Sequence, residues 1–295
     1  MKIYIASSEK HVGKIQEDIH IRNGYIKEGI YSEIATLKNI VRVAKSSDIV
    51  ILKSIWGYHI DYKKFLKQIS ILKKKKVKLV NDYSFIYWNI DKLEYFNEIK
   101  NMNVISTNPL QIRHVKTALD IRNKITEAGK TFNTDKLVIK PSISEGGYLT
   151  FAYDINKENS SIISFLMANK NIDFMVQSYQ SSIVEGEISV VIINGKLLYG
   201  IIRFPGVLTA KKDTRYLKST SIPVSIKKFL SVLEDFFWGK FGVLPSICRV
   251  DFLKNNSGYE ILEIELIDPD LFFRYISVSM REKTISTLLK LVKNL

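Results

Sequence analysis

The residues best suited to chemistry lie on two segments predicted as β-strands, 248–253 and 260–267. Both segments alternate apolar and polar residues, and the Asn- and Gly-containing stretch between them predicts a hairpin turn. Such a hairpin would place Asp251 beside Glu263 and Glu265. Three carboxylates on one sheet face repel each other, and a divalent cation would relieve that repulsion. Oxygen ligands without Cys or His favour Mg²⁺. The alternative to a metal site is an edge strand whose acids face water.

Alternation also predicts which neighbours share the face of these acids. Arg249 lies two residues before Asp251, so we expect its guanidinium on the same face. Ile261 is expected beside Glu263, whereas Glu260 is expected on the opposite face. Asp268 and Asp270 follow the second strand and are interpreted as loop or substrate-side residues, not as metal ligands.

A second candidate for anion binding follows the predicted strand 137–141, which ends in Lys140-Pro141. The next residues, 142–150, contain Gly146 and Gly147, whose backbone N–H groups are free to meet an anion. The P-loop pattern G-x-x-x-x-G-K-[ST] is absent. By itself, a Gly-Gly loop is weak support for phosphate binding.

A loop of aromatic residues follows the buried strand 48–52. Ligands of open α/β sheets bind at the carboxyl ends of the strands. Trp56, Tyr58 and His59 are therefore candidates to contact a substrate, and aromatic packing against a neighbouring element is the alternative.

The elements that must position these residues begin with alternating strands and helices up to about Val80. The segments 3–6, 48–52 and 77–80 read as strands, and 33–44 and 62–72 as helices, from their apolar spacing. This order predicts an open, mostly parallel sheet. No G-x-G-x-x-G follows the first strand, which leaves a dinucleotide site unsupported.

Farther along, the pattern predicts helices, a hairpin and a polar loop. Asn89 or Asp91 is a candidate N-cap, and a helix is expected to end at Gly129. Asn194-Gly195 predicts a hairpin turn, and the basic stretch 211–220 reads as a mobile loop.

Composition narrows the class of protein. The chain has 295 residues, enough for two or three subdomains, and no apolar run long enough for a membrane span. A single cysteine and a first segment too short for a signal peptide predict a reducing cytoplasm. The net charge of +14 could indicate nucleic acid, but the lysines are scattered, so no specific nucleic-acid partner is expected.

The order of these parts resembles the ATP-grasp superfamily of carboxylate–amine ligases. The resemblance is nearest to the branch with glutathione-synthetase-like proteins and the O-ureido-serine cyclo-ligase of D-cycloserine biosynthesis. It rests on Trp-Gly-Tyr-His at 56–59, Trp-Asn-Ile-Asp-Lys at 88–92, Lys140-Pro141, Arg-Val-Asp at 249–251 and Glu-Ile-Glu-Leu-Ile-Asp-Pro at 263–269. It covers most of the chain from about Asp48 onward.

The resemblance implies an ATP-grasp fold: an N-terminal open α/β (pre-ATP-grasp) domain, 1–87, and two α+β subdomains, 88–172 and 173–295, that clasp ATP. It implies an ATP-dependent ligase that joins a carboxylate to an amine through an acyl phosphate. The expected substrate is small and amino-acid-like, in specialised metabolism. A homodimer is common among such ligases.

By resemblance, each motif residue has an expected role. Lys92 and Lys140 would hold ATP phosphates, with Ser144, Gly146 and Gly147 in a lid over them. Gln177 and Tyr179 would contact adenine, Glu185 the ribose or adenine, and Asp251, Glu263 and Glu265 would bind two Mg²⁺. Arg203 and Arg249 would stabilise charge on the transferred phosphoryl group. Contacts to the substrate would come from Trp56, Tyr58, His59 and Arg215.

Two alternatives to the ligase remain, one with the same fold and one with a different fold. An ATP-grasp kinase, or a nucleotide-binding protein without ligase activity, would have the same fold but form no amide. A nucleic-acid-binding protein would leave the ordered motifs unexplained.

Overall fold

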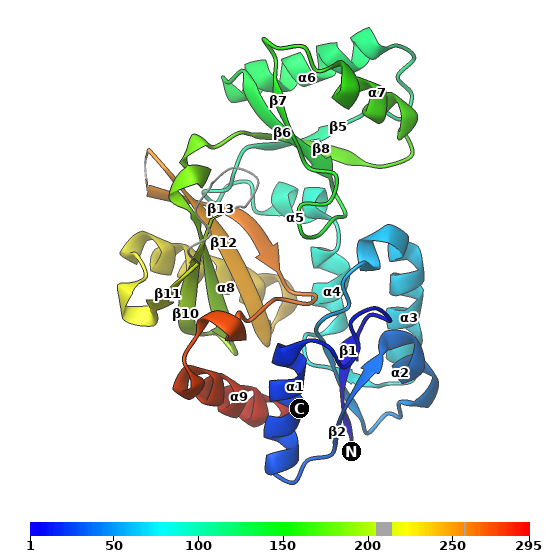
Figure 1. Ribbon diagram of the computed structural model, residues 1–295, viewed down its shortest axis with the longest axis vertical. Helices are drawn as coiled ribbons and strands as arrows, with labels where there is room; N and C mark the ends of the chain where they lie inside the picture. The colour runs from blue at the N-terminus through cyan, green and yellow to red at the C-terminus, as the bar shows by residue number, and fades with distance from the viewer. Residues whose placement is uncertain (205–213, 257) are drawn as a thin grey trace. The chain divides into compact units, whose positions relative to one another are not determined.

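The computed structural model describes residues 1–204, 214–256 and 258–295. Their contacts group into two compact units (Figure 1). The first unit combines Met1–Ile90 with Ser182–Leu295, and the second is Asp91–Ser181. The division into three segments expected from the sequence stays a prediction.

A parallel sheet forms the N-terminal part of the first unit. Its strands are β1 (Ile3–Ser7), β2 (Ser32–Thr36), β3 (Ile49–Leu52) and β4 (Lys78–Leu79). They pair in the order β2-β1-β3-β4, with every pairing parallel. The order changes direction after β2, so a crevice is expected at the carboxyl ends of β1 and β3. The open parallel sheet predicted from the sequence is therefore present.

One prediction in this region is wrong. The segment 33–44 was expected to be a single helix, but its first residues belong to β2, and only α2 (Leu37–Val43) is helical. Strand β2 pairs with β1 from Ser32 to Thr36, and the Thr36 side chain then accepts a hydrogen bond from the Asn39 N–H as the helix N-cap. Tertiary pairing thus overrides an apolar spacing that also fits a helix.

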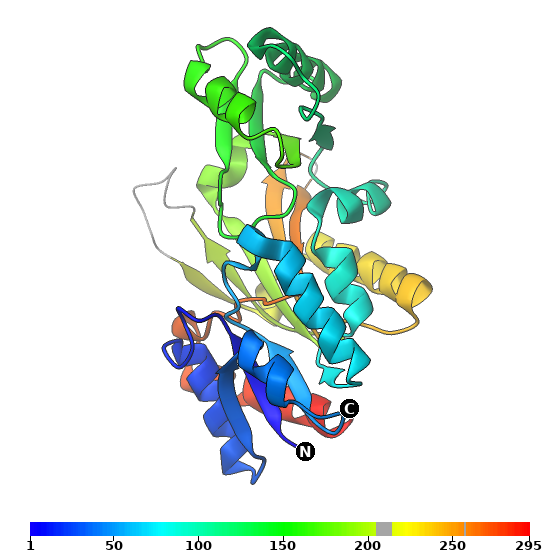
Figure 2. The same cartoon turned by 90° about the vertical axis from the view of Figure 1, so that its right-hand side faces the viewer.

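The other helices of the N-terminal part surround this sheet. They are α1 (Gln16–Lys27), α3 (Tyr62–Lys74) and α4 (Tyr83–Asn89), shown from a second side in Figure 2. Because parallel crossovers are right-handed, the reversal of strand order puts α1 and α2 on opposite faces of the sheet. Helix α1 packs beside the C-terminal helix α9 (Val278–Lys293).

An antiparallel sheet forms the remainder of the first unit. Its strands are β9 (Glu187–Ile193), β10 (Lys196–Arg203), β11 (Arg215–Lys218), β12 (Ile247–Asn255) and β13 (Gly258–Glu265), in the order β11-β10-β9-β12-β13. Helix α8 (Val224–Phe241) packs against this sheet through Phe237 and Leu233. One apolar cluster runs from Ile3 and Ile49 to Val191 and Leu288, so both sheets share a core.

The polar loop expected at 211–220 is partly a strand. Residues 215–218 form β11, which pairs with β10 at the edge of the antiparallel sheet. Arg215 opens this strand opposite Ile202, and its guanidinium lies 5.9 Å from the Phe204 ring. The part of the predicted loop at 211–213 lies outside the described residues.

The second unit is a four-stranded antiparallel sheet with helices against it. Its strands are β5 (Thr107–Leu110), β6 (Lys136–Pro141), β7 (Phe151–Asp154) and β8 (Phe174–Ser178), in the order β5-β8-β6-β7. Its helices are α5 (Lys92–Glu98), α6 (Ala118–Phe132) and α7 (Ser160–Ala168). A separate apolar cluster that includes Ile121, Leu137 and Val176 fills this unit.

Helix α6 does not end at Gly129 as predicted. It continues to Phe132, and Asn133 ends it in the left-handed conformation with φ of 52°. Gly129 lies inside the helix, where a Cβ would come within 2.8 Å of the Thr134 carbonyl oxygen. The glycine therefore marks a close approach and not a helix end.

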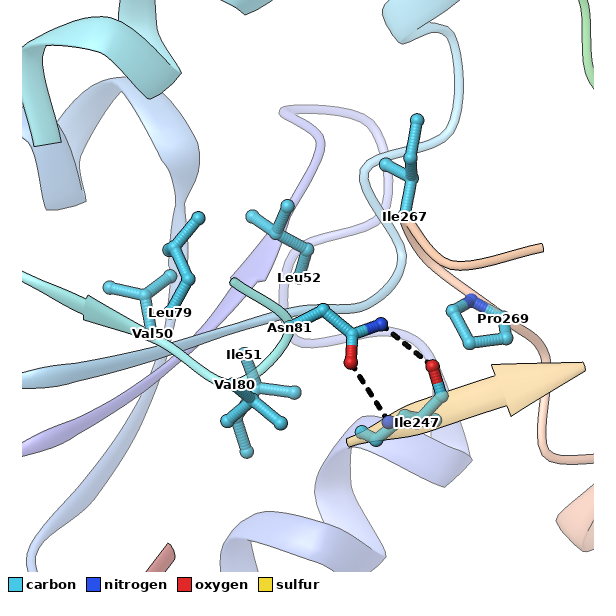
Figure 3. Close-up of a pocket in the computed structure, with 9 residues that line it drawn as sticks. All are labelled: Val50, Ile51, Leu52, Leu79, Val80, Asn81, Ile247, Ile267 and Pro269. Carbon is cyan, nitrogen blue, oxygen red and sulfur yellow. Dashed lines mark hydrogen bonds between the residues drawn. The ribbon is translucent and has the colours of Figure 1, made fainter. Parts of the chain in front are cut away.

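Two buried asparagines connect the N-terminal part to the antiparallel sheet. Asn81 donates to the carbonyls of Ile247 and Leu266 at 2.7 and 2.6 Å and accepts from the Ile247 N–H at 2.9 Å (Figure 3). Asn89 bonds the Ile264 carbonyl and the Leu266 N–H, both at 2.8 Å. Their side chains thus replace strand partners for the ends of β12 and β13.

Among the described residues, no helix is long and apolar enough to cross a membrane.

Candidate functional site

The acids predicted from the sequence do come together. Strands β12 and β13 pair with Asp251 opposite Glu263 and Arg249 opposite Glu265. One carboxylate oxygen from each of Asp251, Glu263 and Glu265 lies within 4.8 Å of the others. The set is made only of carboxylate oxygens, which suits Mg²⁺ better than a softer metal. Asp251 is buried and the two glutamates are partly exposed.

A β-bulge corrects the predicted faces of two neighbours. Glu263 pairs with Asp251, but Ile261 pairs with Phe252, so Leu262 is an extra residue on β13. Ile261 consequently lies on the Phe252 face, away from the acids. Glu260 pairs with Leu253, on the same side of the strand as Asp251, and not on the opposite face as predicted. A bulge inverts the alternation that sequence patterns assume.

Two arginines neutralise the buried acid. Arg249 donates to both carboxylate oxygens of Asp251 at 2.9 and 2.8 Å and to Glu265 at 2.5 Å. Arg203 donates from Nη2 to Asp251 at 2.9 Å and from Nε to the Ser189 hydroxyl at 2.9 Å. Arg203 reaches Asp251 across β9, which lies between β10 and β12.

Glu187 completes this face, and sequence reasoning did not assign it a role. It is ion-paired with Arg203, its partner across the β9–β10 ladder. A usable signal was present, because Glu187 and Ser189 alternate toward one face, as Asp251 and Arg249 do. Around Asp251, this face therefore carries the carboxylates of Glu187, Glu263 and Glu265 and the guanidinium groups of Arg203 and Arg249.

The electrostatics separate the acids into two kinds. Burial opposes ionisation of Asp251, but Arg249 and Arg203 outweigh it and lower its pKa to about 2. Burial raises the pKa of Glu265 to about 7, with Glu263 and Asp251 adding to the rise and Arg249 opposing it. Burial likewise raises the pKa of Glu187 to about 7. Crowded like charges push pKa values apart in this way, and a cation would remove the conflict.

The second unit holds the predicted phosphate-binding groups. Lys92 and Lys140 are both buried. Lys92 follows the N-cap Asp91, which accepts from the Leu93 N–H at 2.9 Å, so Asp91 and not Asn89 caps α5. The Lys92 ammonium donates to the Ser144 carbonyl, and its backbone N–H donates to the Ser142 carbonyl at 3.0 Å. These contacts place Lys92 against the start of the glycine loop.

The glycine loop itself connects β6 to β7. The Ser144 hydroxyl donates to the Pro141 carbonyl at 3.0 Å. Gly146 and Gly147 have φ of 57° and 76°, and a Cβ built on either glycine would meet nothing within 4 Å. The glycines are thus required by the backbone conformation and not by crowding.

The residues predicted to contact adenine lie at the end of β8. The Gln177 side chain is buried and donates to the Thr107 hydroxyl at 2.8 Å. The N–H groups of Ser178 and Tyr179 donate to the carbonyls of Ser106 and Lys136 at 3.1 and 3.0 Å. Glu185, in the first unit, is ion-paired at 3.0 Å with Lys254, and both side chains are exposed.

A cavity of about 250 Å³ lies where the parallel sheet changes direction. Its lining includes Ser7 and Thr36, the last residues of β1 and β2, and Trp56 and Tyr58 from the segment after β3. Trp56 packs edge-on to His11 at 4.8 Å, and Tyr58 lies 5.0 Å from the Phe65 ring. The cavity is therefore where an open α/β sheet binds ligands, although part of each aromatic side chain is used in packing.

His59 and Arg215 are not brought to this cavity's lining. His59 lies in the short 3₁₀ turn Tyr58–Asp61. Arg215 lies on edge strand β11.

A buried charged cluster at the start of α1 and the end of β3 was missed by sequence reasoning. Glu17 at the start of α1 pairs at 2.6 Å with Lys53, which follows β3, and both are buried. Burial opposes the charged form of Lys53, but Glu17 and Asp18 outweigh it and raise its pKa. A lysine directly after a buried strand is the one local signal, and nothing near Glu17 in the sequence points to its partner.

Comparisons with known proteins add the family context. Residues 111–217 match the family described as prokaryotic glutathione synthetase, ATP-grasp domain. No curated protein sequence matches the chain.

Solved structures resemble the whole chain. The D-cycloserine synthetase DcsG matches with a TM-score of 0.77 and 17% identity over 98% of this chain and 99% of that one. A D-alanine–D-alanine ligase from Bacillus anthracis matches with a TM-score of 0.68 and 15% identity over 100% and 96%. The ligase PsnB, in complex with a minimal precursor, Mg and ADP, matches with a TM-score of 0.62 and 12% identity over 99% and 98%.

Proposed function

We propose that this chain, whose ATP-grasp fold is the one predicted from its motif order and confirmed by the structural matches, is an ATP-dependent carboxylate–amine ligase. It would form an amide-type C–N bond through an acyl phosphate. The observation that carries the proposal is the sheet face on which Asp251, Glu263 and Glu265 meet Arg203 and Arg249. Phosphoryl transfer needs acids for metal ions and fixed cations for phosphate charge, and this face supplies both.

The acids would hold two Mg²⁺. Three carboxylates within reach of one another, all with oxygen donors, fit that ion. Bound Mg²⁺ would neutralise the charge of the ATP phosphates. Glu265, whose pKa is raised to about 7, would be in its ionised form as a ligand.

The arginines would act on the phosphoryl group as it moves. Their planar guanidinium groups suit a bidentate grip on phosphate or carboxylate oxygens. Asp251 holds Arg249 by two hydrogen bonds and Arg203 by one, which fixes both groups before the reaction. Charge stabilisation by pre-positioned groups costs little reorganisation during the chemical step.

The residues of the second unit would bind the nucleotide. Lys92 and Lys140 would bind the phosphates, and the loop that contains Ser144, Gly146 and Gly147 would cover them. Excluding water protects an acyl phosphate from hydrolysis. Gln177 and Tyr179 would contact adenine and Glu185 the ribose or adenine.

The substrate would be a small amino-acid-like molecule. Two of the structural neighbours bear names that specify amino-acid products, D-cycloserine and the D-alanine dimer. The cavity beside Trp56 and Tyr58 would receive part of the substrate. Contacts from His59 and Arg215, which lie outside the lining of this cavity, stay predictions. A homodimer, a role in specialised metabolism and a reducing cytoplasm stay predictions of the same proposal.

Oxygen-isotope transfer tests the ligase directly. The protein is incubated with Mg–ATP, a panel of amino acids labelled with ¹⁸O in the carboxyl group, and hydroxylamine or an amine. A ligase transfers one labelled oxygen to the released inorganic phosphate and forms an amide or hydroxamate. A stable phosphorylated product without an amide would instead establish the kinase alternative.

A further inference from the structure

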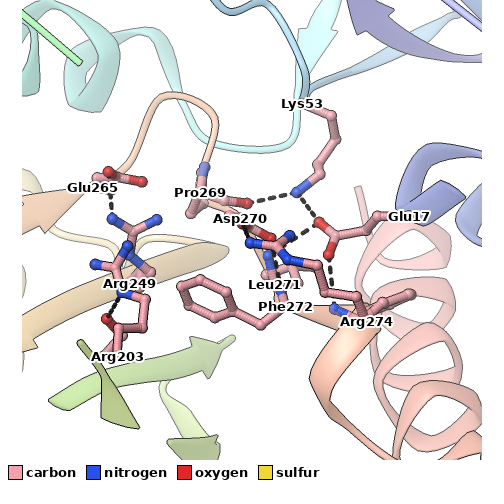
Figure 4. A network of polar contacts seen from close by, with 12 residues as sticks. Glu17, Lys53, Arg203, Arg249, Glu265, Pro269, Asp270, Leu271, Phe272 and Arg274 are labelled. Atoms are coloured by element: carbon pink, nitrogen blue, oxygen red, sulfur yellow. Dashed lines mark hydrogen bonds and ion pairs between the residues drawn. The ribbon is translucent and has the colours of Figure 1, made fainter. Parts of the chain in front are cut away.

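The short loop after β13, residues 269–273, is held by buried side chains from three elements. Lys53 donates from Nζ to the Pro269 carbonyl at 2.5 Å (Figure 4). Glu17 accepts from the N–H groups of Leu271 and Phe273 at 3.0 and 3.1 Å. Tyr199 of β10 donates to the Leu271 carbonyl at 2.6 Å. A loop with so many buried partners has little freedom to move.

At the centre of this loop, Phe272 adopts a conformation that a bulky residue rarely takes. Its φ is +58°, and its side chain is fully buried. Its backbone N–H donates to the Asp270 carboxylate at 2.8 Å. Strained backbone of this kind persists only where its surroundings determine it, and it is found disproportionately at functional sites.

The Phe272 ring lies beside the two arginines of the candidate site. The guanidinium carbons of Arg203 and Arg249 lie 5.1 and 5.4 Å from the ring centroid, and that of Arg274 lies at 5.6 Å (Figure 4). Cations within about 6 Å of a ring centroid are attracted by the negative face of the ring. The ring also limits how the flat guanidinium groups can turn.

We propose that Phe272 is a positioning residue: its ring holds Arg203 and Arg249 in the orientation for phosphoryl transfer, and the buried Glu17–Lys53 pair anchors its loop. The proposal rests on the proposed ligase function for its catalytic consequence. It makes the N-terminal sheet, through α1 and the end of β3, a structural support of the arginines. Asp251 binds both arginines through hydrogen bonds, and Phe272 adds a ring contact to each of them.

The adjacent Phe273 offers a matched control. Phe273 is also buried and lies in the same loop, but its ring lies beside His20, with 6.5 Å between the ring centroids. Phe272→Leu removes the ring and keeps an apolar side chain, and Phe273→Leu makes the same chemical change one residue away. Phe272→Tyr keeps the ring. Glu17→Gln weakens the anchor of the loop without changing any residue of the loop itself.

The experiment measures ADP formation at saturating Mg–ATP, the Kd of a non-hydrolysable ATP analogue with Mg²⁺, and the side-chain Nε–H signals of ¹⁵N-arginine. We expect Phe272→Leu to lower the rate of ADP formation about tenfold or more, because small misplacements of catalytic groups are costly, and to change the Kd less than about threefold. Phe273→Leu should stay within about twofold of the parent rate, and Phe272→Tyr should restore most of the loss.

Two results would overturn the proposal. One is an unchanged rate in Phe272→Leu, and the other is an equal loss in Phe273→Leu, which would indicate loop packing. If Phe272→Leu does not fold, Glu17→Gln decides: a rate about threefold or more lower with an unchanged Kd supports the proposal, and the parent rate contradicts it.

The arginine signals separate this proposal from the proposed function. If the parent protein forms no ADP, the ligase proposal fails. The Nε–H signals of Arg203 and Arg249 should still shift in Phe272→Leu and not in Phe273→Leu. Signals that do not move would remove the positioning role itself.

Discussion

At the scale of single residues, burial and neighbouring charges together set the pKa of each acid in the site. Asp251 is fully ionised because two arginines hold it, whereas Glu265 is pushed toward neutrality by burial and by its acidic neighbours. Alternation along the two strands was enough to predict the meeting of Asp251, Glu263 and Glu265. It could not reveal Glu17 or Phe272, because no local pattern connects Glu17 to Leu271, 254 positions away, or Phe272 to Arg203 on β10.

The raised pKa of Glu265 predicts a pH-dependent metal site. Mg²⁺ binds the ionised carboxylate, so binding must release a proton wherever Glu265 is protonated. We expect the affinity for Mg²⁺ to rise as pH increases from 6 toward 7 and to level off near pH 8. Titration calorimetry in buffers of different ionisation enthalpy measures both the affinity and the proton release.

The same raised pKa also determines whether the stability of the metal-free protein rises or falls with pH. The folded state binds more protons than the unfolded state between the ordinary glutamate pKa and about 7, so Glu265 and Glu187 lower the stability as pH rises through that range. In Glu265→Gln, this loss of stability with rising pH should be smaller.

The prediction on Mg²⁺ binding has its own contrary result. A Mg²⁺ affinity independent of pH from 6 to 8 would show that Glu265 is not a ligand with a raised pKa.

At the scale of elements, side chains from the N-terminal part bond the ends of β12 and β13. Asn89 ends α4 and bonds the backbone of β13 and of the residue after it on both a donor and an acceptor. Together with Asp91, Asn89 was a candidate helix N-cap in the sequence, because asparagine and aspartate are common at that position. Its true partners are about 175 residues away, beyond any local pattern.

Replacing Asn89 tests this connection. Asn89→Ala leaves the Ile264 carbonyl and the Leu266 N–H without their partner in a buried place, so we expect a loss of about 2–4 kcal/mol in the free energy of unfolding. Urea unfolding measures the loss, with the exposed Asn97→Ala as control, expected within about 0.5 kcal/mol of the parent. Equal stability of the two variants would mean that water replaces the lost bonds.

Element predictions failed where pairing or a bulge overrode local pattern. The apolar spacing of 33–44 fits a helix, yet pairing with β1 turns its first residues into β2. The bulge at Leu262 reverses the faces expected for Ile261 and Glu260. Most strands, the hairpins and most helices were predictable because each carries its own periodicity and turn residues, whereas β2 and β11 were not expected as strands.

At the scale of the whole molecule, the fold follows from an ordered set of motifs. The parallel sheet, the glycine loop and the β12–β13 hairpin could each be predicted, and the order of the motifs indicated the ATP-grasp fold. The sequence could not show that Met1–Ile90 and Ser182–Leu295 form one compact unit with a shared core. That packing depends on apolar faces whose partners are far apart in the chain.

The central proposal is that the carboxylates and arginines around Asp251, together with Lys92 and Lys140, serve one Mg–ATP reaction. Its most direct test is the rate of Mg²⁺-dependent ADP formation with a panel of amino acids, compared among the parent protein, Lys140→Ala and Glu263→Gln. Lys136→Ala on the same strand as Lys140 and Glu282→Gln on α9 are the matched controls. We predict that the two site variants lose about 100-fold or more of the parent rate while the controls keep it. Site variants that form ADP as fast as the parent protein would contradict the account.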